Sequence, residues 1–254
     1  MAEKRIYYRG QGKLYAFTRV QSSGVYVPGA GVWLGNAPEF SLSMSVTKQE
    51  HRESYSGQNL VDVSYITEKT ASLSATLEEF SAFNLSLCLN GLNVEKAAAT
   101  ARTAAYTAWE VGKTYLLNGD INVSNVAIVD STSTALVAGT DYTLDAPRGS
   151  FVALTAQTGT VTATYDVGAY SMTNMFTQPD AEWWVRFEGY NMLDNGAPTT
   201  VDLYRVKFDP VQNLGLISAE IAQFQLAASP LADETQPVSG DMGQFGNIKV
   251  VRGV

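Results

Sequence analysis

A strictly alternating stretch, Phe40-Ser41-Leu42-Ser43-Met44-Ser45-Val46-Thr47, decides the fold of this chain. A second stretch, Ala71-Ser72-Leu73-Ser74-Ala75-Thr76-Leu77, repeats the pattern. Because successive side chains of a strand point to opposite faces, each stretch is predicted to place apolar groups on one face and hydroxyls on the other. A face of small hydroxyls has no large apolar or basic group with which to bind a ligand, and it forms a smooth, hydrated surface. The residues expected on this face are Ser41, Ser43, Ser45, Thr47, Ser72, Ser74 and Thr76.

The composition of the 254-residue chain favours a β-rich globular protein, because glycine, tyrosine and β-branched residues are abundant. The hydrophobic share of 45% is too high for a disordered chain. The net charge of −8 argues against a tight grip on nucleic acid, which depends on clustered Lys and Arg. No apolar run approaches the roughly 18 residues of a membrane-spanning helix. We therefore expect no membrane partner and synthesis in the cytoplasm.

The segment 48–59 is polar throughout and is predicted to form a long exposed hairpin loop. The returning strand begins at Val61, with a predicted interruption near residues 67–69. Its register should be firmly fixed, because a slip of one residue would turn the apolar set outward. The residues expected to share the apolar face of this strand are Val61, Val63, Tyr65, Ala71, Leu73, Ala75 and Leu77.

The best helix candidate is the segment 78–90, with Phe80, Phe83 and Leu87 at helical spacing. Glu78-Glu79 is expected in the first turn, where the helix dipole favours acids, and Asn90-Gly91 is expected to cap the other end. The alanine-rich segment 95–105 is typical of either a helix or a linker.

The segment 106–170 is predicted to be a small inserted all-β sandwich of Ig-like type, because short apolar stretches alternate with turn signals at regular intervals. The alternating pattern of long strands resumes after this segment, so residues 1–105 and 171–254 are predicted to form one core domain. Strands are expected at 123–129, 135–137, 142–144, 151–154 and 161–165 in the insert, and at 182–188, 200–208, 216–226 and 247–251 in the core domain.

Few residues suggest chemistry. The single histidine, His51, lies among charged residues without metal-ligand spacing, and Cys88 lies on the apolar stripe of the predicted helix. The adjacent acids Glu78-Glu79 do not set the carboxyl separation that glycoside hydrolysis needs. Asp233, Glu234 and Asp241 lack calcium-loop spacing. We therefore predict no enzyme, no metal and no cofactor.

The order of several motifs resembles major tail tube proteins of long-tailed (siphovirus-type) bacteriophages over residues 5–105 and 170–250. The motifs are Gly35-Asn36, the alternating strand, His51-Arg52-Glu53-Ser54 with Ser56-Gly57, Leu77-Glu78-Glu79-Phe80, Asn84-Leu85, the stretch 203–208 and the strand 222–227. The insert, with Gly139-Thr140-Asp141-Tyr142, resembles small β modules of phage tail components and would project outward as decoration.

The resemblance implies a tail-tube type β-sandwich or barrel fold with one packed helix, and a location in the virion tail. Such proteins form stacked hexameric rings whose strands join into a barrel around a DNA channel. The partners would be copies of the chain, the tape measure protein and other tail proteins, with double-stranded DNA passing transiently. The hydroxyl set would line the channel, and the residues of the other parity, Leu42, Met44, Leu73 and Leu77, would face the subunit core and the helix. The hairpin loop, with His51, Arg52, Glu53, Tyr55 and Asn59, would contact the next ring and order on stacking.

Two other interpretations of the sequence remain. The hydroxyls could face bulk water on a monomer. The chain could also be a cell-surface or receptor-binding β-sandwich that recognises carbohydrate or protein through Trp184 or exposed tyrosines, although alternation places either Trp183 or Trp184 in the core.

Overall fold

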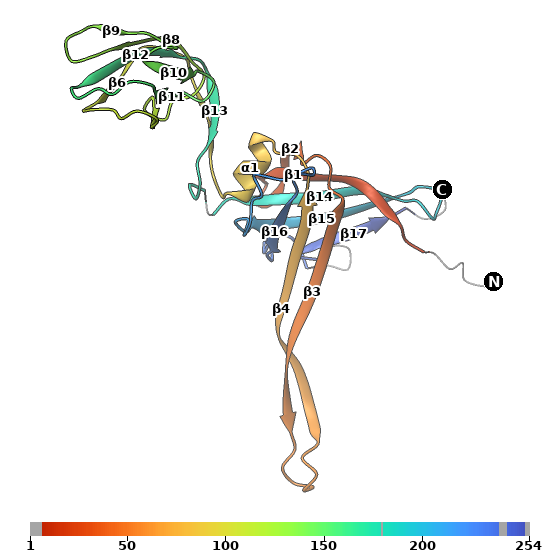
Figure 1. Cartoon of the computed structure of the whole chain (residues 1–254). Coiled ribbons are helices and arrows are strands. Elements are labelled where there is room, and N and C mark those ends of the chain that lie inside the picture. Colours follow the sequence, from red (N-terminus) through yellow and green to blue (C-terminus); the bar gives the residue numbers. More distant parts are fainter. Residues whose placement is uncertain (1–6, 179, 239–242, 252–254) are drawn as a thin grey trace. The chain divides into compact units, whose positions relative to one another are not determined.

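A computed structural model describes residues 7–178, 180–238 and 243–251. The protein is mainly β, as the composition predicts. It divides into two compact units, one made of Met1–Leu92 with Asn174–Val254 and the other of Asn93–Thr173. Figure 1 shows both units, with their elements labelled where there is room.

The first unit is built on one antiparallel sheet whose strands run in the order β2-β1-β14-β15-β16-β4-β3, with β17 also paired to β15. Its strands are β1 (Gly10–Ser22), β2 (Val25–Trp33), β3 (Glu39–Arg52), β4 (Val61–Leu77), β14 (Glu182–Asn191), β15 (Ala197–Phe208), β16 (Phe224–Pro230) and β17 (Gly246–Val250). Asn195-Gly196 makes the turn between β14 and β15, where both residues adopt positive φ.

The hairpin of β3 and β4 is longer than predicted. Pairing continues to Arg52 opposite Val61, so residues 48–52, expected in a loop, belong to the strand. Backbone pairing does not require apolar side chains, which is why polarity alone misplaced the end of the strand. Thr47 pairs with Glu68 and Lys48 with Ile66, which leaves Thr67 as an extra residue at a bulge. The predicted interruption near 67–69 is this bulge.

One face of the sheet is covered by α1 (Ala82–Cys88) and by the base of the β3–β4 hairpin. Phe83 of the helix packs edge-on against Trp183 with ring centroids 5.3 Å apart. The residues that form the buried cluster are Leu14, Ala16, Leu34, Leu73, Ala75, Leu77, Leu87, Cys88, Val185, Leu203, Val206, Phe208, Phe224, Leu226 and Ala228.

The helix is shorter than predicted and begins after Ser81, whose hydroxyl accepts a hydrogen bond from the Asn84 amide at 3.1 Å. Its first turn holds no acid. Glu78 and Glu79 precede the helix, and their carboxylates instead accept hydrogen bonds from Asn36. The predicted C-terminal cap is confirmed, because the amide of Gly91 donates to the carbonyl of Ser86 and Asn90 adopts a positive φ.

The predicted strand 216–226 is wrong over most of its length. The chain there is irregular until β16 begins at Phe224, and Ile217 is 99% exposed. The alternation predicted for 182–188 is confirmed, since Trp183, Val185 and Phe187 contact the buried cluster while Trp184 and Arg186 face Asp202 on the other side.

The second unit is a two-sheet sandwich, with orders β6-β12-β8-β9 and β10-β11-β7, beside a small β13-β5 pair. The residues 95–105, expected as a helix or a linker, form strands that pair with β12 and β13, so the unit starts well before residue 106. Its strands are β5 (Asn93–Lys96), β6 (Ala99–Tyr106), β7 (Thr114–Leu116), β8 (Val123–Val129), β9 (Ala135–Leu136), β10 (Tyr142–Asp145), β11 (Ser150–Ala153), β12 (Val161–Val167) and β13 (Tyr170–Thr173).

Candidate assembly surface

The predicted hydroxyl residues share one face of the β3–β4 hairpin, which we call the hydroxyl face. Directly opposed residues of antiparallel strands lie on the same side. The pairs on this side are Glu39–Thr76, Ser41–Ser74, Ser43–Ser72, Ser45–Thr70 and Thr47–Glu68. All seven predicted residues are among them, and the charges on these pairs are carboxylates, with no Lys or Arg. This face therefore offers no cation to a phosphate group.

The hydroxyl face extends onto β16. Gln225 is the cross-strand neighbour of Thr76, and its amide donates a hydrogen bond of 3.0 Å to the Ser74 hydroxyl. One row across three adjacent strands, Glu39, Thr76 and Gln225, is thus polar, whereas the next row, Ser41 and Ser74, ends at Ala227.

The opposite face of the hairpin is buried only near its base. Leu73 and Ala75 belong to the core, and Phe40 stacks on Phe187 with centroids 5.3 Å apart. Further along, the ribbon leaves the sheet, as Figure 1 shows, and Met44 is 77% exposed. The expectation that Met44 faces the subunit's own core is therefore wrong.

The bulge at Thr67 also changes which residues share a face. Beyond it, Tyr65 pairs with Gln49 and Val63 with His51, on the side that carries Thr47. Ile66 pairs with Lys48 and takes the apolar side instead. The prediction that Val63 and Tyr65 share a face with Leu73 is wrong, because one extra residue reverses the alternation.

The tip of the hairpin is organised around the carboxylate of Glu53, which is buried. It accepts hydrogen bonds from the amides of Tyr55 and Ser56 at 2.9 and 2.8 Å, and from the Ser56 hydroxyl. The Leu60 amide, at 3.4 Å, closes the loop. These donors, led by the Ser56 hydroxyl, lower the pKa of Glu53 to about 2. Tyr55 projects from this loop and is 86% exposed.

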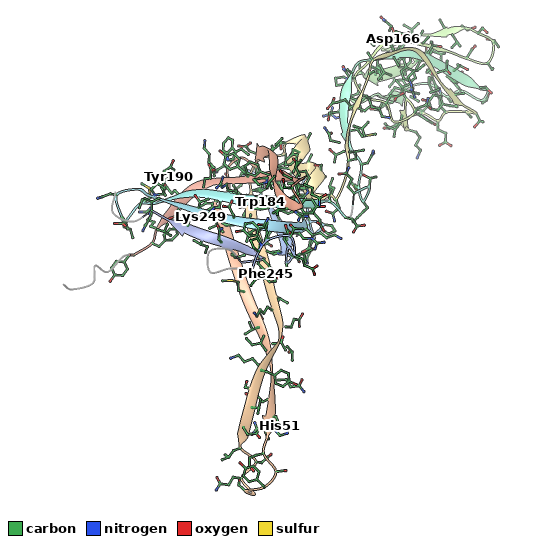
Figure 2. The ribbon with its side chains drawn as sticks, turned by 180° about the vertical axis from the view of Figure 1, so that it is seen from behind. His51, Asp166, Trp184, Tyr190, Phe245 and Lys249 are labelled. Carbon is green, nitrogen blue, oxygen red and sulfur yellow. The ribbon has the colours of Figure 1, made fainter. Side chains whose placement is uncertain are left out.

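The other predicted loop residues lie beside the tip. Nδ1 of His51 is 2.7 Å from Oδ1 of Asp62 across the hairpin, and this hydrogen bond lowers the pKa of Asp62. Figure 2 places His51 far along the ribbon. Arg52 donates to the Asn59 carbonyl at 3.1 Å. His51 and Asp62 are solvent-exposed, so the pair links the two strands of the ribbon and does not form a pocket.

Three of the remaining candidates for chemistry, Cys88, Trp184 and Asp233, are buried. Burial raises the pKa of the Cys88 thiol to about 12. Trp184, proposed as an exposed sugar platform, is 8% exposed and donates to Asp202 at 3.2 Å, so that expectation is wrong. Asp233 pairs with Arg19 at 2.7 Å, and Asp241 lies outside the described residues. Within the described part of the chain, no group of three or more acidic, His or Cys side chains could hold a metal.

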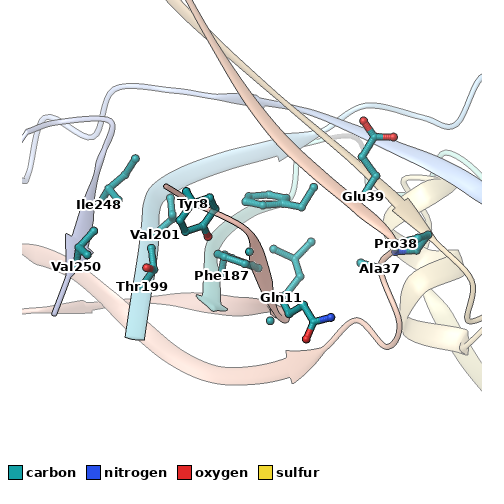
Figure 3. A pocket seen from close by; sticks show the side chains of 14 residues that line it. Tyr8, Gln11, Ala37, Pro38, Glu39, Phe187, Thr199, Val201, Ile248 and Val250 are labelled. Atoms are coloured by element: carbon teal, nitrogen blue, oxygen red, sulfur yellow. The ribbon is translucent and has the colours of Figure 1, made fainter. Parts of the chain in front are cut away.

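The uncovered part of the core-side sheet face forms a groove of about 580 Å³, shown in Figure 3. One row across the sheet joins Leu14, Phe187, Val201 and Ile248, and the next joins Gly12, Gly189, Thr199 and Val250. The glycines make room for the Phe187 ring, because a Cβ on Gly189 would lie 2.4 Å from it. Sequence reasoning missed this groove, since it depends on how far β3 and α1 cover the sheet.

None of the helices in the described ranges is long and apolar enough to cross a membrane. No curated protein shows a significant match to the chain. A family model matches residues 7–249, which covers both units and most of the sequence. The chain therefore belongs to the family described as "Protein of unknown function UCP028589".

Proposed function

We propose that this chain is a structural virion protein that polymerises as stacked hexameric rings into the tail tube of a long-tailed phage. The observation that carries the proposal is the hydroxyl face, in which eight hydroxyls and two carboxylates occupy five successive cross-strand pairs. Lining a channel, such a surface would give DNA phosphates no ion pairs, and therefore no counterion release to hold them. The net charge of −8 acts in the same direction.

The edges of the sheet support assembly. β2 and β3 end the strand order within the described residues, so each has one side without a strand partner. Beyond Leu73, β3 is the one strand of the described ranges that pairs with β4, and an isolated two-stranded ribbon is marginally stable in water. Open edges of this kind invite pairing with another chain. In a ring of copies these edges would pair, and the ribbon would gain neighbours.

The proposed partners follow from the assembly. Copies of the chain form rings and stacks, the tape measure protein and other tail proteins contact the tube, and double-stranded DNA passes without specific binding. The second unit would decorate the outside of the tube.

Electron microscopy of the concentrated purified protein tests the proposal. We expect negative-stain images to show hollow rods of uniform diameter whose number rises with concentration. A receptor-binding module would stay monomeric or trimeric at every concentration, and that result would overturn the proposal.

The double variant Ser43→Arg with Ser74→Arg tests the channel assignment separately. Its control is the double variant Ser43→Gln with Ser74→Gln. Both pairs of substitutions lengthen the side chains, but only Arg adds a positive charge that can form ion pairs with phosphates. We expect both variants to form tubes and the Arg variant alone to slow genome ejection. Equal ejection by the two variants would contradict a channel-facing position.

A further inference from the structure

In the first unit, the base of the β3–β4 ribbon packs against part of one sheet face. The same side of the ribbon and the same face of the sheet both extend beyond this contact. The ribbon side that carries Leu42 and Leu73 near the sheet carries Met44, Val46 and Ile66 further out, where all three are exposed. The sheet side that carries Leu14 continues to Ile248 and Val250, which are exposed in the groove. Each element thus presents an apolar surface that no other described residue of its own chain covers.

We propose that the distal ribbon side of one copy occupies the groove of a second copy. This inference rests on the proposed function, and it identifies the partner surface of the stacking hairpin. The ribbon side consists of Met44 opposite Ala71, Val46 opposite Lys69 and Lys48 opposite Ile66, and the pair Glu50–Ser64 follows further out.

Continuity with an existing contact supports this occupant. The base of the same ribbon already covers the neighbouring part of the same sheet face, where Phe40 stacks on Phe187. Phe40 and Phe187 also line the groove. The groove is therefore lined by the same kind of apolar side chains that this side of the ribbon contacts within its own chain. The distal part of the ribbon would pack on the sheet of a second copy in the way that the base of the ribbon packs on the sheet of its own chain.

The charges are complementary. Among the described residues, the groove is lined by one charged residue, Glu39 at its rim, and by no Lys or Arg. The ribbon side carries two cations, Lys48 and Lys69, against the one carboxylate of Glu50 further out, in a chain of net charge −8. The other exposed apolar segment, near Ile217 and Ile221, carries Glu220 and would bring a second carboxylate to the groove. The ribbon is therefore the better occupant.

One polar atom in the groove lacks a partner. The Thr199 hydroxyl is buried, lines the groove and has no hydrogen-bond partner among the described residues. A buried polar atom without a partner is costly. An ammonium group from Lys48 or Lys69 of the second copy could donate to it.

The contact joins two different surfaces, so it propagates. A copy that inserts its ribbon into one neighbour keeps its own groove free for the next, and such heterologous contacts build stacks or filaments. The opposite side of the ribbon near its base, the hydroxyl face, stays free to line a channel.

Val46→Asn compared with Ser45→Asn tests the inference on the full chain. Both positions are exposed and adjacent, but they lie on opposite sides of the ribbon. We expect both variants to keep the wild-type melting temperature as free subunits. Val46→Asn should raise the concentration needed for rod formation about tenfold, from the lost apolar burial, while Ser45→Asn leaves it unchanged.

A cross-linking measurement identifies the surface contacted. Subunits with Val46→Cys are mixed with subunits carrying Ile248→Cys and treated with a short bismaleimide. Native Cys88 is buried and stays unreactive. We expect more linked dimer than from a mixture with Ser45→Cys in place of Val46→Cys.

The outcomes separate the two proposals. If wild-type rods form but the Asn variants assemble alike, or the two mixtures cross-link equally, a different occupant fills the groove and only this inference fails. If wild-type protein never forms rods, the proposed function fails with it.

Discussion

Burial changes abruptly from residue to residue along the β3–β4 ribbon. Leu73 is buried in the core, whereas Met44, on the same side of the ribbon and one pair further out, is largely exposed. Side chains of similar size and chemistry therefore contribute very differently to the free energy of unfolding. The alternating sequence gives no sign of where this change occurs.

We expect Leu73→Ala to lower the free energy of unfolding of the free subunit by about 2–5 kcal/mol, because it leaves a cavity in the core. Met44→Ala should change it by less than about 0.5 kcal/mol. Urea unfolding of unassembled protein measures both values. Similar losses for the two variants would show that the distal ribbon packs on its own subunit.

The Glu53 carboxylate makes the order of the hairpin tip depend on pH. Its pKa in the folded protein is about 2, below the ordinary value of 4.5. The stabilising effect of a lowered carboxyl pKa is fully present above 4.5 and is lost as the pH falls toward 2. We expect Glu53→Gln to speed amide hydrogen exchange at Tyr55, Ser56 and Leu60 at neutral pH. Glu50→Gln, at an exposed position nearby, is the control and should leave these amides protected.

This experiment also examines the expectation that the tip orders only on stacking. The hydrogen bonds around Glu53 organise the loop in the single chain. If exchange at the tip is already slow in the free subunit, ordering on assembly is at most a small effect. Fast exchange that slows only in rods would support the expectation.

At the level of elements, β17 joins the sheet through its ladder with β15 and through one buried carboxylate. Asp202 on β15 is 2% exposed and accepts hydrogen bonds from Lys249 at 2.9 Å, from Nη2 of Arg186 at 3.4 Å and from the indole of Trp184. Figure 2 shows Trp184 and Lys249 on this part of the sheet. Because β17 also forms one wall of the groove, this carboxylate supports the proposed contact surface.

We expect Asp202→Asn to destabilise the protein by about 1–3 kcal/mol, since two cations lose their charged partner while both remain partly solvated. Glu188→Gln removes an exposed carboxylate 3.8 Å from Arg186 and should cost less than about 0.5 kcal/mol. Thermal unfolding of the two variants makes the comparison, and equal melting temperatures would contradict a structural role for Asp202.

At the level of the whole molecule, the second unit has its own buried cluster, which includes Trp109, Phe151 and Tyr165. The two points where the chain enters and leaves it are close, because the Asn174 amide donates to the Leu92 carbonyl at 2.9 Å. A unit with its own core and adjacent ends is removable without stretching the rest of the chain.

We expect a variant lacking residues 93–173, with Leu92 and Asn174 joined by a short glycine linker, to fold cooperatively and still to form rods. Circular dichroism reports folding, and negative-stain microscopy reports assembly. A folded deletion variant that fails to assemble would show that the second unit takes part in the tube contacts and is not decoration alone.

The sequence by itself determined the mainly β fold, the side of β3 and β4 that carries the hydroxyls, the helix cap at Asn90-Gly91 and most strands of the second unit. These features depend on neighbours in sequence, through alternation and turn chemistry. Only the tertiary structure decided the end of β3 at Arg52, the exposure of Met44, the burial of Trp184 and the groove beside Phe187. Each of these depends on which distant strand covers which face, and local periodicity carries no information about that.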